Sequence, residues 1–126
     1  MTGLTGTSPA HDVVRETLDR WRRAFDDRSV AEMVSLFVED ALFQGISPRL
    51  RAGRAEIAEY YGDAGEGTRA TVQVLEAQRL GDGLVGGFAD VTFTARAGET
   101  FPIRLSVVIR HREDAWLISQ YHAAAR

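Results

Sequence analysis

The stretch that decides the fold runs from residue 69 to residue 122 and reads RATVQVLEAQRLGDGLVGGFADVTFTARAGETFPIRLSVVIRHREDAWLISQYH. Four segments in it are rich in Val, Ile, Thr and Phe, the residues that half-buried strands favour. Only short turns separate them, at residues 81–83, 97–98 and 113–114, and such turns force neighbouring strands to run antiparallel. Long antiparallel strands coil, so the pattern predicts a curved sheet whose concave face other elements must cover.

Helical patterns precede this sheet. Apolar residues recur every three or four positions over residues 9–26, which predicts an amphipathic helix of about five turns. Residues 29–32 have the form of a capping box and predict a second, short helix that reaches residue 37. A brief strand is expected at residues 41–44 and a third helix at residues 54–61. Helices segregated on one face of an antiparallel sheet make an α+β domain.

The length and composition fit a single domain and argue against several classes of function. The 126 residues fit one domain, expected at residues 8–126 after a flexible tail at residues 1–7. A net charge of −3 argues against a nucleic-acid partner, which needs a basic face. There is no cysteine, and the three histidines form no metal-binding pattern, so neither a metal nor another cofactor is expected. Without a signal peptide or an apolar stretch of membrane-spanning length, the expected location is cytoplasmic, away from the membrane.

Three short patterns resemble a known superfamily. They are LF-x-x-DA-x-F at residues 36–43, G-R-x-x-I-x-x-Y-Y at residues 53–61 and W-x-I-x-x-x-H at residues 116–122. Together they resemble the nuclear transport factor 2-like superfamily, and most of all its SnoaL-like or ketosteroid-isomerase-like group of small bacterial proteins. The resemblance implies a cone-shaped fold that encloses a pocket. It also points to accessory proteins of antibiotic biosynthesis in bacterial secondary metabolism.

The resemblance does not carry the ketosteroid isomerase chemistry with it. In those enzymes a Tyr and an Asp hold the developing enolate, and a second Asp shuttles the proton. The matching positions here hold Trp21, Ser106 and Gly45 respectively. Trp offers only an N–H donor, Ser is no acid near neutral pH, and Gly has no side chain. Steroid isomerisation by that mechanism is therefore not expected.

Asp90, Arg104 and His122 are the candidate catalytic residues. Asp is disfavoured in the middle of a strand, and Arg104 lies on the next strand, close enough to pair with it. If residue 90 faces residue 106, then Asp90, Arg104 and Ser106 share one face of the sheet, whereas a slip of one residue separates Asp90 from Arg104. The pair would be a tuned acid with an anion-binding Arg, a cross-strand salt bridge, or an outer-face charge at a dimer seam. His122, at the end of the last strand, would be either a general base or a structural residue.

The candidate pocket lining combines aromatic and polar side chains between the helices and the concave face. The expected ligand-binding residues are Trp21, Phe25, Phe43, Gln44, Tyr60, Tyr61 and Ser106. The last two strands also carry apolar residues on both faces, and a monomer rarely leaves a large apolar patch in water. A homodimer that pairs the outer sheet faces is therefore expected.

Three functions remain open on the sequence alone. The first is a pocket protein that binds a hydrophobic small molecule, such as a polycyclic or polyketide-derived metabolite. The second is an isomerase, cyclase or epoxide hydrolase that uses Asp90, Arg104 or His122. The third is a dimerisation or interaction module that has no ligand. The missing isomerase residues favour binding over catalysis.

Overall fold

The structure, a computed structural model, describes residues 8–63 and 67–126, so the tail predicted at residues 1–7 lies outside the described residues. Three helices and six strands follow in the order α1 (Pro9–Asp26), α2 (Val30–Ser35), β1 (Phe37–Gln44), β2 (Arg51–Ala52), α3 (Arg54–Gly62), β3 (Arg69–Gly81), β4 (Leu84–Thr94), β5 (Thr100–Arg112) and β6 (Ala115–Ala125). The predicted α+β class, the helices and the four-strand meander are confirmed. No helix among the described residues is long and apolar enough to cross a lipid bilayer.

The six strands form one sheet in the order β2-β1-β6-β5-β4-β3. Strands β3 to β6 are antiparallel neighbours, as predicted, but β1 joins the sheet parallel to β6. The prediction of a brief strand at residues 41–44, preceded by helix to residue 37, was wrong because β1 begins at Phe37. Phe37 and Val38 are buried, and Phe37 pairs with Ile118 of β6. Pairing with a buried strand therefore outweighs the helical pattern at this point.

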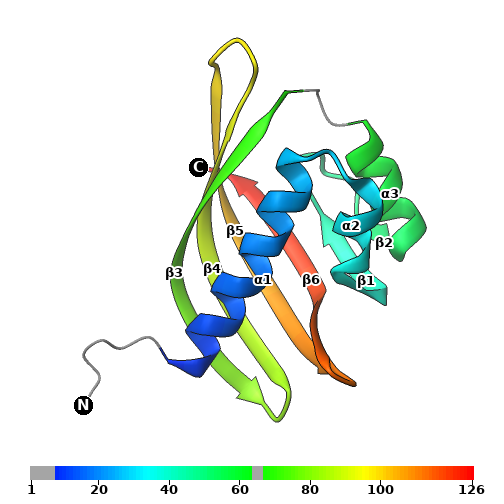
Figure 1. Cartoon of the computed structure of the whole chain (residues 1–126), viewed down its shortest axis with the longest axis vertical. Helices are drawn as coiled ribbons and strands as arrows, with labels where there is room; N and C mark the ends of the chain where they lie inside the picture. Colours follow the sequence, from blue (N-terminus) through cyan, green and yellow to red (C-terminus); the bar gives the residue numbers. More distant parts are fainter. Residues whose placement is uncertain (1–7, 64–66) are drawn as a thin grey trace.

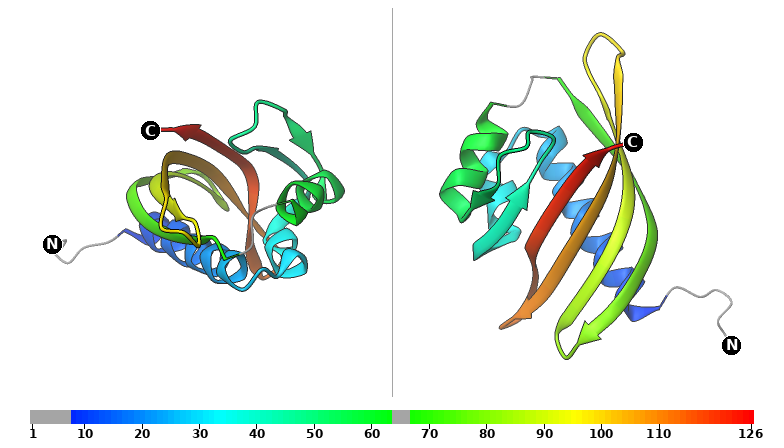
Figure 2. Two further views of the ribbon diagram at one scale, coloured as in Figure 1. Left: turned by 90° about the horizontal axis from the view of Figure 1, so that it is seen from above. Right: turned by 180° about the vertical axis from the view of Figure 1, so that it is seen from behind.

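Helix α1 lies along the concave face of the sheet (Figure 1). Seen from above, the sheet curves around this helix, while α2, α3, β1 and β2 gather beyond β6 at one end of the cone (Figure 2, left). From behind, none of the helices in the described part of the chain covers the convex face of β3 to β6 (Figure 2, right). We call this convex surface the outer face. The opposite surface, which packs against α1, is the helix side.

Helices α1 and α2 each begin after a serine that caps the free amides of the first turn. The Ser8 side chain accepts a hydrogen bond from the His11 amide at 3.1 Å, and Ser29 accepts one from the Glu32 amide at 3.3 Å. The capping box at Ser29 is only half formed, because the Ser29 amide donates to the carbonyl of Ala24. That bond ties the end of α1 to the start of α2 and fixes the turn between them.

Gly87 allows α1 to approach β4 closely. A Cβ atom built on Gly87 would lie 2.8 Å from Cγ2 of Val14 and 3.1 Å from the Glu76 carbonyl oxygen. The pairing of β3 with β4 shifts register at two places, between Val74 and Glu76 and between Arg79 and Gly81, and the extra residue lies in β3 each time. The missing side chain of Gly87 thus makes room for the helix, and β4 itself stays regular.

Candidate ligand-binding site

A pocket of about 490 Å³ opens on the helix side of the sheet, at the end of the cone where α3 and the segment after β1 face β4, β5 and β6. Its lining comes from every layer of the fold: Phe25, Ile46, Ser47, Arg51, Tyr60, Tyr61, Asp63, Thr68, Phe93, Phe101, Ile103, Tyr121 and Ala123. Most of these side chains are apolar or aromatic. A cavity of this size and character is typical of small-molecule sites.

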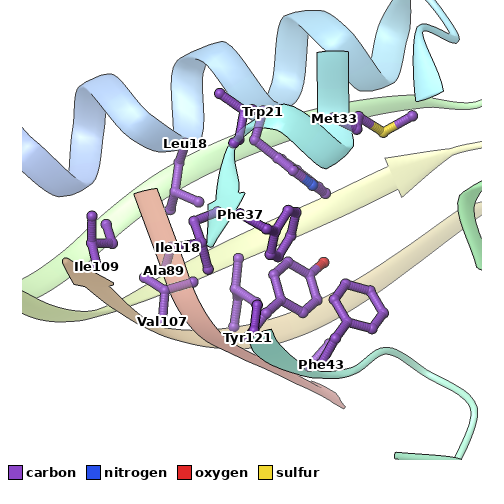
Figure 3. Close-up of a cluster of buried hydrophobic side chains, with 14 of the residues drawn as sticks. Leu18, Trp21, Met33, Phe37, Phe43, Ala89, Val107, Ile109, Ile118 and Tyr121 are labelled. Atoms are coloured by element: carbon purple, nitrogen blue, oxygen red, sulfur yellow. The ribbon is translucent and has the colours of Figure 1, made fainter. Parts of the chain in front are cut away.

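Aromatic rings build the floor and wall of this pocket. Tyr121 and Phe43 stack with ring centroids 4.4 Å apart and an angle of 12° between their planes. Figure 3 shows the two rings side by side, with Phe37 and Trp21 packed above them. At the wall, Phe25 of α1 packs against Phe93 of β4, with 5.2 Å between the two ring centroids. Such ring pairs add to the free energy of burial, so the pocket has a rigid base.

Buried hydroxyl groups lie beneath the aromatic surface. The indole Nε1 of Trp21 donates a hydrogen bond to the Tyr61 hydroxyl at 2.8 Å, and both side chains are buried. Burial away from solvent raises the pKa of Tyr61 well above its ordinary value, and repulsion by the negative charge of an ionised Tyr121 raises it further. Loss of solvent likewise raises the pKa of Tyr121. Both phenols are therefore neutral at physiological pH, and they act as hydrogen-bonding groups rather than bases.

Tyr60 occupies the space beside Gly45. A Cβ atom built on Gly45 would collide with the hydroxyl and ring of Tyr60. The Tyr60 hydroxyl also accepts a hydrogen bond from the Ile46 amide at 3.2 Å. An acidic side chain at position 45 and the present position of Tyr60 are thus mutually exclusive.

Two charged residues stand at the mouth of the pocket. Arg51 of β2 has a side chain that is only 12% exposed, and its guanidinium carbon lies 5.3 Å from the centre of the Tyr60 ring. Asp63 lies just after α3 and is exposed. No histidine is found among the described lining residues, and Asp63 is their only carboxyl group. The described residues contain no cluster of three or more His, Cys, Asp or Glu that could hold a metal ion.

The match to a known family covers almost the whole of this architecture. Residues 14–125 match the family model described as SnoaL-like domain. The chain belongs to the SnoaL-like family. No curated protein matches this SnoaL-like chain. The predicted resemblance, the α+β class and the cone fold are thereby confirmed.

Solved structures show the same fold at low sequence identity. An NTF2-like protein of unknown function from Pseudomonas putida superposes with a TM-score of 0.81 at 16% identity, covering 95% of this chain and 89% of that one. A putative calcium/calmodulin-dependent protein kinase II association domain from Xanthomonas campestris gives 0.81 at 21% identity, with coverages of 95% and 89%. A ketosteroid isomerase-like protein from Erwinia carotovora atroseptica gives 0.75 at 16% identity, with coverages of 94% and 98%.

The SnoaL-like pocket contains part of the lining expected from the sequence. Phe25, Tyr60 and Tyr61 line it directly. Trp21 and Phe43 lie behind these residues as fully buried neighbours.

The expectation that Gln44 and Ser106 reach the pocket was wrong. Ser106 pairs with His122, and His122 pairs in turn with Gln44, so all three share the outer face. Their strand neighbours Phe43 and Leu105 point to the helix side and are buried. Side chains alternate along a strand, so the burial of these neighbours fixes the outward direction.

Asp90, Arg104 and His122 also lie on the outer face of this SnoaL-like domain. Asp90 pairs with Arg104 in the sheet, not with residue 106 as considered above, and Arg104 Nε donates to Asp90 Oδ1. Arg126 adds a second contact, with its Nη1 at 3.4 Å from Asp90 Oδ2. This register places Asp90 and Arg104 on the same face of the sheet. That face is the outer face, so both side chains point away from the pocket. The geometry therefore matches the cross-strand salt bridge, and it does not bring these groups into the pocket.

Several residues of the site were not predicted from the sequence. Arg51 lies in a two-residue strand between the predicted elements, and nothing in the local pattern distinguishes it from the other arginines. Phe101 and Ile103 follow from the alternation of β5 once its buried face is known. Tyr121 reaches the pocket because of a register shift in β6, which the sequence does not mark, and Arg51 had no sequence signal.

Proposed function

We propose that this SnoaL-like protein binds a hydrophobic, ring-containing small molecule in the pocket between its helices and its sheet, and that it does not itself transform the molecule. The observation that carries the proposal is the aromatic cavity of about 490 Å³, with its rigid floor of stacked rings. Flat apolar molecules fit such a surface. Fused-ring and polyketide-derived metabolites are the class that the family resemblance suggests.

The polar groups of the pocket support binding over catalysis. General acid–base catalysis requires a group whose pKa lies near the working pH and that reaches the reacting proton. The burial of Tyr61 and Tyr121 moves their pKa values away from that range, and Asp63 is exposed at the mouth. Asp90, Arg104 and His122 lie on the opposite face of the sheet.

A fluorescent apolar probe tests this proposal. We expect N-phenyl-1-naphthylamine, which is neutral and brightens in apolar sites, to bind the wild-type protein. Ala123→Phe places a ring inside the pocket and should weaken binding by at least about tenfold, since a loss of ~1.4 kcal/mol suffices. Ala123 is 5% exposed and lines the pocket, whereas Ala124 is exposed, so Ala124→Phe is the matched control and should bind like wild type. Absence of binding to wild type, or equal binding by both variants, would contradict the proposal.

We further propose that the outer face pairs with a second copy of the chain. Phe88 and Leu80 are 53% and 48% exposed there, and together with Ser106 and Val108 they border a shallow hollow of about 520 Å³. Exposed apolar patches of this kind mark interaction surfaces. Two of the structurally similar proteins are described as putative association domains.

A charge on the outer face is expected to dissociate this dimer. Phe88→Glu would place a carboxylate in the apolar patch, and each copy would then meet the charge of the other. Light scattering coupled to gel filtration should show a dimer for wild type and a monomer for Phe88→Glu. Leu50→Glu is the control, because Leu50 is 61% exposed but lies before β2, away from this face. A monomeric wild-type protein at micromolar concentration would rule the pairing out.

A further inference from the structure

Arg51 is held inside the wall of the pocket. It lies in β2, which pairs with β1, and its side chain is only 12% exposed. The guanidinium carbon lies 5.3 Å from the centre of the Tyr60 ring, and Nη1 donates a hydrogen bond to the Glu56 carbonyl oxygen at 3.2 Å. The ring and the carbonyl fix the guanidinium at the place where the polar mouth meets the aromatic interior.

The positive charge of Arg51 is poorly compensated by the protein. Its carboxylate neighbour is Glu59, whose Oε1 lies 3.8 Å from Nη1, too far for a direct hydrogen bond. Glu59 is itself 67% exposed, so water weakens the pair further. The Nε atom of Arg51 is buried and has no acceptor among the described residues. A buried donor without a partner costs free energy, so the protein itself leaves the guanidinium of Arg51 incompletely satisfied.

Two other arginines of the chain, Arg54 and Arg22, have close acceptors for their guanidinium groups. Arg54 Nε and Nη2 both donate to the Phe37 carbonyl oxygen, at 3.0 and 2.7 Å. Arg22 lies between the carboxylates of Asp19 and Asp26, with 3.2 Å to each. Arg51, in contrast, combines a low exposure with a distant counter-charge and a place in the pocket wall.

We propose that the ligand of the pocket is a hydrophobic carboxylate whose acid group pairs with Arg51. This inference rests on the proposed binding function and adds the chemical class of the ligand. The ring system lies against Phe25, Phe93 and Tyr121, and the carboxylate lies at the mouth. A guanidinium matches a carboxylate with two parallel hydrogen bonds, and charge-assisted bonds in a partly desolvated site are the strong ones.

A matched pair of probes tests the charge separately from the pocket. 2-Naphthoate and 2-naphthamide have the same ring and nearly the same shape, and only the first carries a charge. Isothermal titration calorimetry on wild type should show tighter binding of the naphthoate by about tenfold, the difference of one charge-assisted pair. Arg51→Gln should abolish this preference, because the naphthoate loses a charge-assisted pair and the naphthamide loses at most one neutral hydrogen bond. Arg49→Gln is the control, because Arg49 is exposed and outside the pocket lining.

The outcomes separate the two proposals. If wild type binds neither probe, the proposed binding function fails and the present inference fails with it. If naphthamide binds and naphthoate binds no better, or if Arg51→Gln retains the preference, the carboxylate inference is overturned while the apolar pocket stands. Should Arg51→Gln not fold, Arg51→Lys replaces it. Lys keeps the charge but loses the planar fork, so the preference for naphthoate over naphthamide should fall several-fold.

Discussion

Phe43→Ala should lower the free energy of unfolding by about 3–5 kcal/mol, the range for removing a large aromatic side chain from a core. Phe43 is fully buried, and it meets four other rings, with centroid distances of 5.9 Å to Phe37, 4.9 Å to Tyr60, 5.5 Å to Tyr61 and 4.4 Å to Tyr121. Removing its ring leaves a cavity beneath the pocket floor. Urea denaturation followed by circular dichroism measures the change.

The control for this experiment is a phenylalanine at the rim. Phe101 also lines the pocket, but it is 60% exposed. Phe101→Ala should therefore cost less than about 1 kcal/mol, since little apolar area returns to water. Equal losses for Phe43→Ala and Phe101→Ala would show that the stacked rings do not form the rigid base described above.

Alkaline pH should destabilise the protein steeply. Burial raises the pKa of Tyr61 and of Tyr121 in the folded state, while an exposed tyrosine in the unfolded chain ionises near a pKa of about 10. Above that pH the unfolded chain binds fewer protons than the folded one. The free energy of unfolding is then unaffected below about pH 10 and falls above it by ~1.4 kcal/mol per pH unit for each tyrosine. The loss continues until the raised pKa values of the folded state are reached.

The composition of the chain makes this titration unusually clear. The sequence has no lysine and no cysteine, so no ordinary side-chain amine or thiol titrates in the same range. Urea denaturation at pH 9, 10 and 11 gives the slope, and Tyr61→Phe should reduce it by about half, because one of the two shifted phenols is gone. A flat profile above pH 10, or a slope unchanged by Tyr61→Phe, would refute the claim that these hydroxyls stay neutral in the folded protein.

The fold could be predicted from the sequence because its signals are local and repeated. Short turns at residues 81–83 and 113–114 and apolar periodicity over residues 9–26 each agree with the final structure. The parallel pairing of β1 with β6 could not be predicted in this way. It joins residues far apart in the sequence, and no local pattern encodes such a contact.

The site was harder to predict because it depends on which face of each strand is buried. In β5 the odd-numbered positions from Ile103 to Ile109 are all apolar, and they are the buried ones. This alternation already indicates that Arg104 and Ser106 point outward. For β5, therefore, the sequence does contain the signal that places its polar residues.

His122 was misplaced for a different reason. Strict alternation in β6 puts residues 118, 120 and 122 on one face, so His122 would follow the buried Ile118 to the helix side. The structure has a register shift in this strand: Ile118 pairs with Ile109, whereas Gln120 pairs with Val108. The extra residue, Ser119, turns Tyr121 to the helix side and His122 outward. A single inserted residue reverses the phase of a strand, and the sequence of β6 does not mark it.

The most direct test of the central claim is a crystal structure of the protein soaked with N-phenyl-1-naphthylamine. Electron density for the probe is expected against Phe25 and Phe93, over the ring of Tyr121. Density over Phe88 on the outer face, or a pocket that stays empty at saturating probe, would contradict it.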